Sequence, residues 1–198
     1  RNPVLVAKQI MSLAVMSDNR FSFGVGLSPW PEDFAVTGVP WEGRGRRMDE
    51  MIEILRGLST GDYYEFHGDH FDFQSIKMTP APSEPIPILI GGHSDAAIRR
   101  AARVGDGWMH AGGTDEDLRK MIDRLKELRS EYDRSNEPFE IHVISMEGFT
   151  LAGLRRLEDG GVTDAVVGLR PGYEGDAMSL EEKLSAVHRF ADEVISKL

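Results

Sequence analysis

The sequence predicts an α/β fold in which amphipathic helices connect the strands of a parallel sheet. An almost unbroken apolar run, typical of a strand buried on both faces, is formed by Ile86, Ile88, Leu89 and Ile90. After this run, short apolar segments alternate with longer segments whose apolar residues recur with the period of a helix. This alternation indicates β-α units, which build parallel sheets.

The N-terminal part contains two predicted helices, one strand and a loop. A helix follows Pro3, where the missing N–H of proline costs little, and a second helix spans Met48 to Leu58. The strand covers residues 21–26 and ends in glycines. We expect residues 27–43 to form an ordered loop, because they contain three prolines and two glycines.

Residues 63–73 have a different character, with aromatic residues on both sides of His67-Gly68-Asp69-His70. This pattern predicts a β-hairpin with a Gly-Asp tip. A proline-rich linker follows the hairpin at residues 79–87.

The C-terminal part predicts further strand–helix units. Its strands cover residues 86–90, 107–110, 140–146 and 163–169, and its helices cover residues 94–103, 114–132, about 150–159 and 180–197. Ser179 and Glu182 predict a capping box at the start of the last helix. With the first strand there are five, and the sheet either closes as a barrel or stays open. A complete eight-unit barrel typically needs ~250 residues, and the five units in these 198 residues are about five-eighths of one.

Composition excludes several classes of protein. The chain has 198 residues, 40% of them hydrophobic, which predicts a single domain over residues 1–198. Cysteine is absent, which excludes a disulfide scaffold, a thiol nucleophile and a zinc site with cysteine ligands. The net charge of −10 disfavours nucleic-acid binding, and no apolar run approaches the ~18 residues of a transmembrane helix. No signal-peptide pattern opens the chain, so we expect a cytoplasmic protein with no nucleic-acid or membrane partner.

The segment Gly91-Gly92-His93-Ser94 is the strongest candidate for a binding site. It joins a predicted strand to a predicted helix, and ligands of parallel α/β proteins bind at the C-terminal ends of strands. Glycines allow close approach of a ligand, while the free N–H groups and dipole of the next helix favour an anion such as phosphate. Ser94 could cap that helix or donate its hydroxyl to the phosphate. The same residues also fit a plain tight turn with an N-cap, and both interpretations stay open.

The strand at residues 107–110 is a second candidate. Trp108 and His110 share one of its faces, and Met109 lies on the other. If the face with His110 points into the mouth of a barrel, His110 lies near a bound ligand. Alternatively, Trp108 belongs to the core, and His110 lies at the rim with backbone hydrogen-bond partners.

Two other groups of polar residues are better explained by structure. His67 and His70 flank the predicted hairpin turn, and because no third ligand is spaced nearby, we predict no metal site. The arginines at positions 44, 46 and 47 begin a helix, where cations oppose the helix dipole. We therefore expect them to pair with the acidic residues at positions 49–53 or with a ligand.

Blocks of residues that follow one another through nearly the whole chain are similar to a known family. They are Arg1-Asn2-Pro3, Asn19-Arg20-Phe21, Gly24-Val25-Gly26, Trp30, Glu32-Asp33-Phe34, Gly38-Val39-Pro40, Arg44 to Glu50 (RGRRMDE), Phe66-His67-Gly68, Pro87 to Gly92 (PILIGG), Arg100-Ala101-Ala102 and Asp106-Gly107-Trp108. In this order and spacing they resemble the bacterial luciferase-like monooxygenase superfamily, especially its branch that uses the deazaflavin coenzyme F420. The blocks are specific for the superfamily and less so for the coenzyme.

The resemblance implies a (β/α)8 TIM barrel of the luciferase-like type. Within that barrel, the five predicted strands correspond to strands four to eight, so the first three β-α units are not in this sequence. The hairpin at about residues 61–80 falls where the family has an insertion between strands four and five. The beginning Arg1-Asn2-Pro3 is typical of the interior of a longer sequence.

The resemblance also implies the positions that line the site. Residues that match the phosphate-holding segment of the family, or that line the cofactor mouth, are Gly91, Gly92, His93, Ser94, Met109, His110 and Ala111. Gly26 and Trp30 match positions that flank the ring or the substrate. The catalytic His or Trp of the family would precede Arg1, and Leu27 stands where some F420 dehydrogenases have Glu. We therefore assign no catalytic residue.

The expected function is a flavin- or F420-dependent oxidoreductase or monooxygenase that acts on a small organic substrate as a homodimer or other homo-oligomer. F420 is the expected cofactor and FMN the alternative. A different possibility is a non-catalytic partial barrel that binds a cofactor or serves in assembly, because five strands leave two unpaired edges. A phosphate-binding aldolase or isomerase is a third, but no candidate lysine stands at a strand end for the aldolase form.

Overall fold

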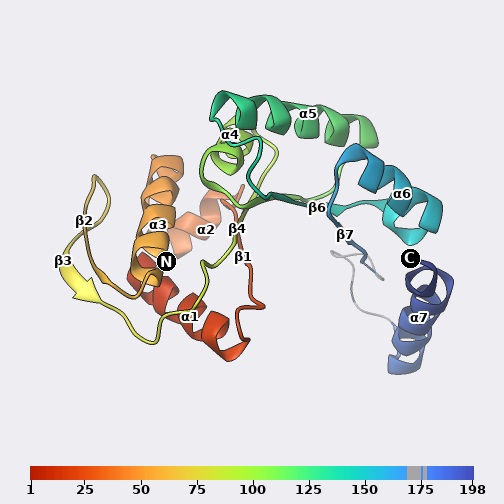
Figure 1. Ribbon diagram of the computed structural model, residues 1–198, viewed down its shortest axis with the longest axis horizontal. Coiled ribbons are helices and arrows are strands. Elements are labelled where there is room, and N and C mark those ends of the chain that lie inside the picture. Colours follow the sequence, from red (N-terminus) through yellow and green to blue (C-terminus); the bar gives the residue numbers. More distant parts are fainter. Residues whose placement is uncertain (169–174, 176–177) are drawn as a thin grey trace.

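The computed structural model describes residues 1–168, 175 and 178–198 and contains a five-stranded sheet (Figure 1). The strands have the order β1-β4-β5-β6-β7, and every neighbouring pair is parallel. Their bounds are Phe23–Val25 for β1, Ile88–Gly91 for β4, Gly107–His110 for β5, Glu140–Ile144 for β6 and Asp164–Val166 for β7. The predicted α/β fold with a parallel sheet is confirmed.

Helices connect these strands. Their bounds are Pro3–Met16 for α1, Pro31–Val36 for α2, Arg44–Ser59 for α3, Asp95–Val104 for α4, Asp115–Glu131 for α5, Leu151–Gly160 for α6 and Leu180–Glu193 for α7, with 3-10 helices at Met146–Phe149 (η1) and Ile195–Lys197 (η2). None of the described helices is both long and apolar enough to cross a membrane.

Polar caps set where the helices begin. Ser94, Thr114 and Thr150 each accept a hydrogen bond from a backbone N–H in the first turn of α4, α5 and α6. Ser179 and Glu182 form the predicted capping box of α7. Ser94 and Thr114 follow closely after β4 and β5, so these two caps fix the points at which the chain turns back along the sheet.

The core lies between the sheet and its helices. Figure 1 shows α4, α5 and α6 along one side of the sheet. Ile88, Ile90 and Trp108 point to the helical side and are almost completely buried. Ile144 and Val166 point to the other side and remain 47% and 41% exposed. One face of the sheet is therefore covered, and the other is partly bare.

Asp106 connects the beginnings of three strands with one helix. Its Oδ2 accepts a hydrogen bond from the Ile88 backbone N–H at 2.8 Å and another from the Arg56 guanidinium of α3, also at 2.8 Å. Its backbone N–H donates to the Ile88 carbonyl at 2.9 Å, and its carbonyl accepts from the Glu140 N–H at 3.0 Å. Together these bonds fix the register of β4, β5 and β6.

The predicted hairpin forms a separate antiparallel sheet of β2 (Tyr63–His67) and β3 (Asp72–Lys77). Its tip is bound to α3 through Glu50. The Glu50 carboxylate accepts hydrogen bonds of 3.0–3.2 Å from the backbone N–H groups of residues 69–71. One acidic side chain therefore holds the whole tip.

The structure corrects the expectation that residues 27–43 form only a loop. Pro31 begins the short helix α2 within this segment, and Glu32 and Asp33 lie in its first turn. Proline is favourable at the first helical position, and acidic residues there interact well with the helix dipole. The prolines that suggested a loop include the one that begins this helix.

Several expected boundaries were too wide. The edge strands β1 and β7 are shorter than residues 21–26 and 163–169, since the described sheet pairs each on one side only. Leu169 lies outside the described residues. The strand expected at 140–146 ends at Ile144, and the last helix ends at Glu193 rather than at residue 197.

The expected ion pairs within α3 were also wrong. Asp49 binds Arg100 of α4 at 2.7 Å and Arg103 at 3.2 Å, and Glu50 is engaged by the hairpin. Arg44 lies instead over the Trp41 ring, 3.5 Å from its centroid. The acidic residues of the RGRRMDE block therefore join elements to one another.

Replacing Asp106 with alanine should lower the free energy of unfolding by about 2–3 kcal/mol, because the buried Ile88 N–H loses its acceptor and Arg56 keeps only the Val104 carbonyl. Urea unfolding followed by circular dichroism measures this change. Asp123→Ala on the exposed side of α5 is the matched control and should change stability by less than about 0.5 kcal/mol. Equal stabilities of the two variants would contradict the proposed importance of Asp106.

Glu50→Ala should release the hairpin tip while the parallel sheet stays folded, because three N–H groups lose one shared acceptor. We expect the amides of residues 69–71 to exchange with deuterium roughly tenfold faster, as the loss of ~1–2 kcal/mol of local protection implies. Glu53→Ala, at an exposed position on the same helix, is the control. Unchanged exchange at the tip would show that Glu50 does not hold it.

Candidate functional site

The C-terminal ends of β1, β4 and β5 bring together most of the predicted site residues. Gly91 ends β4 and pairs with Met109 of β5. On the other side, a Cβ atom on Gly26 would lie 3.8 Å from the Gly91 carbonyl oxygen, so these two glycines are neighbours. The segments 91–94 and 110–113 therefore lie beside each other.

The turn at residues 91–94 is held from both ends. Gly92 has a φ of +129°, and its carbonyl accepts a hydrogen bond from the Trp108 indole N–H at 2.9 Å. Ser94 caps α4, because its Oγ accepts from the Ala97 N–H at 3.2 Å. The Ser94 hydroxyl hydrogen stays available, and no described residue accepts a hydrogen bond from the N–H of Gly92 or His93. The turn is capped and still has unused donors.

His93 and His110 form a stacked pair across the two segments. Their ring centroids are 4.6 Å apart, with 20° between the ring planes. The exposed His93 accepts a hydrogen bond at Nε2 from the Ala111 N–H at 3.1 Å. The buried His110 accepts at Nδ1 from the Gly112 N–H at 3.3 Å. The two imidazoles thus tie the segments together.

The environment of His110 favours its neutral form. Burial lowers the pKa of His110 below its usual value, and the nearby His93 lowers this pKa further. The Ile144 backbone and Asp117 act in the opposite direction without reversing the shift. A neutral ring is consistent with the hydrogen bond, because only an unprotonated Nδ1 can accept the Gly112 N–H.

Met109 and Trp30 are placed apart from this pair. Met109 points to the opposite face of β5, where its sulfur would lie 2.9 Å from a Cβ atom on Gly24. Trp30 is 55% exposed at the start of α2. Within the described part of the chain, no hydrogen bond or ring contact joins it to the other predicted site residues.

A cavity of about 750 Å³ adjoins residues 112–113 at the ends of β5, β6 and β7. Its size is in the range of small-molecule sites. Arg189 and Glu193 of α7 add charge to a lining that is otherwise mainly apolar. The apolar side chains in this lining are Ile144, Met146, Phe149, Val166, Phe190 and Val194.

The donors around the turn fit an oxyanion such as phosphate. The first turn of α4 has N–H groups without helical partners, and the helix dipole adds partial positive charge there. The one acidic residue in that turn, Asp95, is paired with Arg99 at 2.6 Å and Arg124 at 3.3 Å. These hydrogen bonds hold the pKa of Asp95 below its usual value and compensate its charge.

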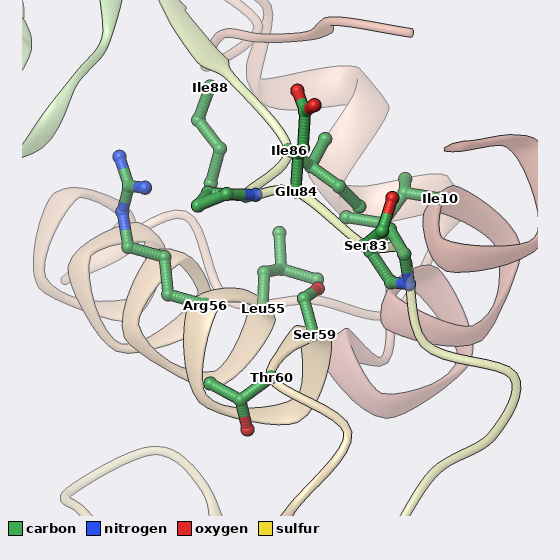
Figure 2. A pocket seen from close by; sticks show the side chains of 11 residues that line it. Ile10, Leu55, Arg56, Ser59, Thr60, Ser83, Glu84, Ile86 and Ile88 are labelled. Atoms are coloured by element: carbon green, nitrogen blue, oxygen red, sulfur yellow. The ribbon is translucent and has the colours of Figure 1, made fainter. Parts of the chain in front are cut away.

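A second pocket, of about 240 Å³, lies at the opposite end of β4 (Figure 2). Leu55, Ile86 and Ile88 supply apolar walls, and the buried Ser59 hydroxyl there has no hydrogen-bond partner in the described part of the chain. None of the predicted site residues lines this pocket.

One group of possible metal ligands occurs among the described residues. The His142 Nε2 lies 2.7 Å from a Glu140 carboxylate oxygen and 3.3 Å from one of Asp164. The contacts within the group account for its geometry. His67 and His70 do not share a site, because His67 pairs with Asp72 and His70 lies against Gly43.

Sequence reasoning did not identify the role of Trp108 or of residues 112–113. The glycine pair after β5 was a usable signal, because it repeats the strand–glycine pattern of residues 91–92. The indole hydrogen bond of Trp108 to Gly92 leaves no trace in the sequence pattern.

Comparisons with known proteins identify relatives of the whole chain. The family model described as luciferase-like monooxygenase matches residues 1–147. An uncharacterized protein of Mycobacterium tuberculosis is 56% identical over 200 residues, which cover 100% of this chain and 69% of that protein.

Two relatives with named activities are more distant. An F420-dependent glucose-6-phosphate dehydrogenase of Gordonia bronchialis is 30% identical over 145 residues, which cover 70% of this chain and 43% of the enzyme. An FMNH(2)-dependent dimethylsulfone monooxygenase of Pseudomonas putida is 32% identical over 130 residues, which cover 63% of this chain and 36% of the enzyme. The matched region is less than half of each enzyme.

A solved structure extends the comparison to the fold. The coenzyme F420 dependent tetrahydromethanopterin reductase of Methanopyrus kandleri superposes with a TM-score of 0.78, covering 100% of this chain and 80% of the other at 15% identity. At this identity the likeness concerns the fold alone. It agrees with a sheet that forms part of a luciferase-like TIM barrel.

Proposed function

The chain belongs to the luciferase-like monooxygenase family, and from this premise we propose that it serves an oxidoreductase or monooxygenase reaction of a small organic substrate, with reduced F420 or FMN as cofactor. One observation carries the proposal. The turn at residues 91–94 combines unused N–H donors, a free hydroxyl hydrogen and a helix N-terminus, all at the C-terminal edge of the sheet.

In this proposal the turn binds the phosphate of the cofactor. The N–H groups of Gly92 and His93 and the hydroxyl of Ser94 donate to phosphate oxygens, and the dipole of α4 adds to the attraction. Gly91 leaves room because it has no side chain, and Gly26 lies beside it. These donors are available, because no acceptor among residues 1–168, 175 and 178–198 competes for them.

The cavity beside residues 112–113 is the proposed place for the ring and the substrate. Its walls are mainly apolar, and Met109 and Ala111 lie on the strand and loop that lead to it. Trp30 is not part of this lining, because it follows β1 at the other edge of the sheet, and it remains a proposed ring- or substrate-flanking residue. A bound reduced F420 or FMN supplies the hydride or the electrons, and the chain supplies orientation and a mainly apolar surface. No catalytic residue is assigned.

The proposal also includes the identity of the cofactor and the association of the chain with further copies of itself. The resemblance places F420 before FMN, and relatives named for each cofactor support considering both. Asp49 and Glu50 of the RGRRMDE block make structural contacts, so these two residues do not distinguish F420 from FMN. The phosphate turn suits both cofactors, because both carry a phosphate. We expect the functional form to be a homodimer or another homo-oligomer.

Ser94→Asp tests the phosphate turn. Aspartate caps helices as well as serine does, so stability should change by less than about 1 kcal/mol, while a new negative charge repels phosphate. Fluorescence titration should show that the unaltered chain binds FMN more tightly than riboflavin, which lacks the phosphate. We expect Ser94→Asp to weaken FMN binding by roughly tenfold or more and to leave riboflavin binding unchanged. F420 should lose affinity in the same way.

Thr150→Asp, at the N-cap of α6, is the matched control and should keep the preference for FMN. Gly92 is a poorer choice for substitution, because a Cβ atom there would lie 2.8 Å from the Ala97 Cβ and would disturb the fold itself. A chain that binds neither FMN nor F420, or that binds FMN and riboflavin equally, would refute the phosphate turn.

The alternative is a non-catalytic binding or assembly protein. It is favoured by exposed apolar side chains on the helices next to the two edge strands, namely Leu5, Leu13 and Met16 on α1 and Leu180, Leu184 and Val187 on α7. Unpaired strand edges and apolar faces promote association. Light scattering after gel filtration should then give a dimer or larger species that shows no preference for FMN over riboflavin. A stable monomer would count against this alternative.

A further inference from the structure

The imidazole of His110 occupies an unusual position for a residue of a ligand-binding edge. Its side chain is only 3% exposed, on the helical side of β5. The ring stacks on His93 at 4.6 Å and lies 5.5 Å from the Trp108 ring. A ligand on the exposed side of the strand ends therefore reaches the backbone of residues 111–113 before it reaches this ring.

The hydrogen bonds of His110 define its tautomer. The Nδ1 atom accepts from the Gly112 N–H at 3.3 Å, so in the neutral ring the proton is on Nε2. The Nε2 atom is buried and has no hydrogen-bond partner among the described residues. A Cβ atom on Gly113 would lie 3.6 Å from it. The ring is thus held by the hydrogen bond from Gly112, by stacking and by the nearby Ile144 backbone, which raises the pKa of His110.

The segment that His110 holds has little conformational preference of its own. Gly112 and Gly113 have φ values of +94° and +138°, in a region that glycine enters readily. A Cβ atom on Gly112 would meet no atom of the described residues within 4 Å, so their packing does not fix this residue either. The hydrogen bond from Gly112 to His110 is therefore the main restraint on the orientation of this turn.

We infer that His110 is a positioning residue, whose neutral imidazole holds the Gly112–Gly113 turn in the orientation that the ligand of residues 91–94 requires. This inference rests on the proposed function. It differs from direct contact with the cofactor, because His110 acts through the Gly112 amide. Ala111, whose N–H is bonded to His93, transmits the same restraint to the neighbouring turn.

The inference has a defined pH dependence. A protonated imidazole carries hydrogens on both nitrogens, so Nδ1 can no longer accept from Gly112. Affinity should therefore be constant above the pKa of His110 and fall as the pH drops through it, below the usual histidine value. The groups that face the ring are His93, which opposes protonation, and Asp117 and the Ile144 backbone, which favour it.

Two substitutions of His110 distinguish the role of its Nδ1 atom from that of its Nε2 atom. In His110→Asn the amide oxygen can take the place of Nδ1 and accept from Gly112, whereas in His110→Gln the amide reaches the place of Nε2. FMN affinity is measured at about pH 7.5 and about pH 4.5, because the pKa of His110 lies below the usual histidine value and the lower pH must lie well below that value. We expect His110→Asn to bind like the unaltered chain at the higher pH and His110→Gln to bind about five- to tenfold more weakly, the effect of losing one hydrogen bond.

The pH profile provides the readout that a purely structural role would not change. The FMN phosphate itself titrates near pH ~6, so the profile of His110→Asn gives the contribution of the ligand. The unaltered chain should lose more affinity at the lower pH than His110→Asn does. Identical profiles, or equal affinities of the Asn and Gln variants, would overturn the inference while leaving the phosphate turn intact.

Nitrogen NMR of the ligand-free chain with ¹⁵N-labelled histidine gives an independent test. The resonances of His110 should show an unprotonated Nδ1 and a protonated Nε2 at neutral pH, and the Gly112 amide should shift as His110 titrates. A protonated Nδ1 would overturn the inference without reference to any ligand. Failure of the unaltered chain to bind FMN and F420 would instead refute the proposed function and, with it, the ligand role of His110.

Discussion

The hydrogen bonds of Asp106 are the constraint on which the arrangement of the strand ends depends. They fix where β4, β5 and β6 begin, and strands of so few residues carry this register directly to their C-terminal ends. Gly91 therefore lies opposite Met109, and His110 lies opposite Val143. A shift of one residue would turn Trp108 and His110 to the wrong face of the sheet.

The side chains on the two faces of β5 have different roles at the candidate site. On the helical face, Trp108 holds the Gly92 carbonyl and His110 holds the Gly112 amide, so buried side chains shape two exposed turns. On the other face, Met109 stands beside Gly24 and leaves the strand ends accessible. The backbone supplies the binding groups, and the side chains behind it determine their orientation.

Local patterns made much of this fold predictable. The apolar run before Gly91, the caps at Ser94 and Ser179 and the glycine pair depend on residues close in sequence, and each lies where the sequence predicts it. The contacts that sequence reasoning missed join distant residues, such as Arg56 with Asp106 and Trp108 with Gly92. These contacts depend on which helices and strands pack together, and a single sequence does not show which elements are neighbours in space. The sequence also did not tell which face of β5 points toward the helices, because that depends on how the helices pack on the sheet.

The most direct test of the account is an NMR titration of the ¹⁵N-glycine-labelled chain with FMN and with F420. The account predicts that the amides of Gly91, Gly92, Gly112 and Gly113 shift together and saturate at one ligand concentration, while Gly57 and Gly61, at the far end of α3, stay unchanged. Shifts confined to the pocket near Ser59, or no shifts with either cofactor, would contradict a phosphate site built from the ends of β4 and β5.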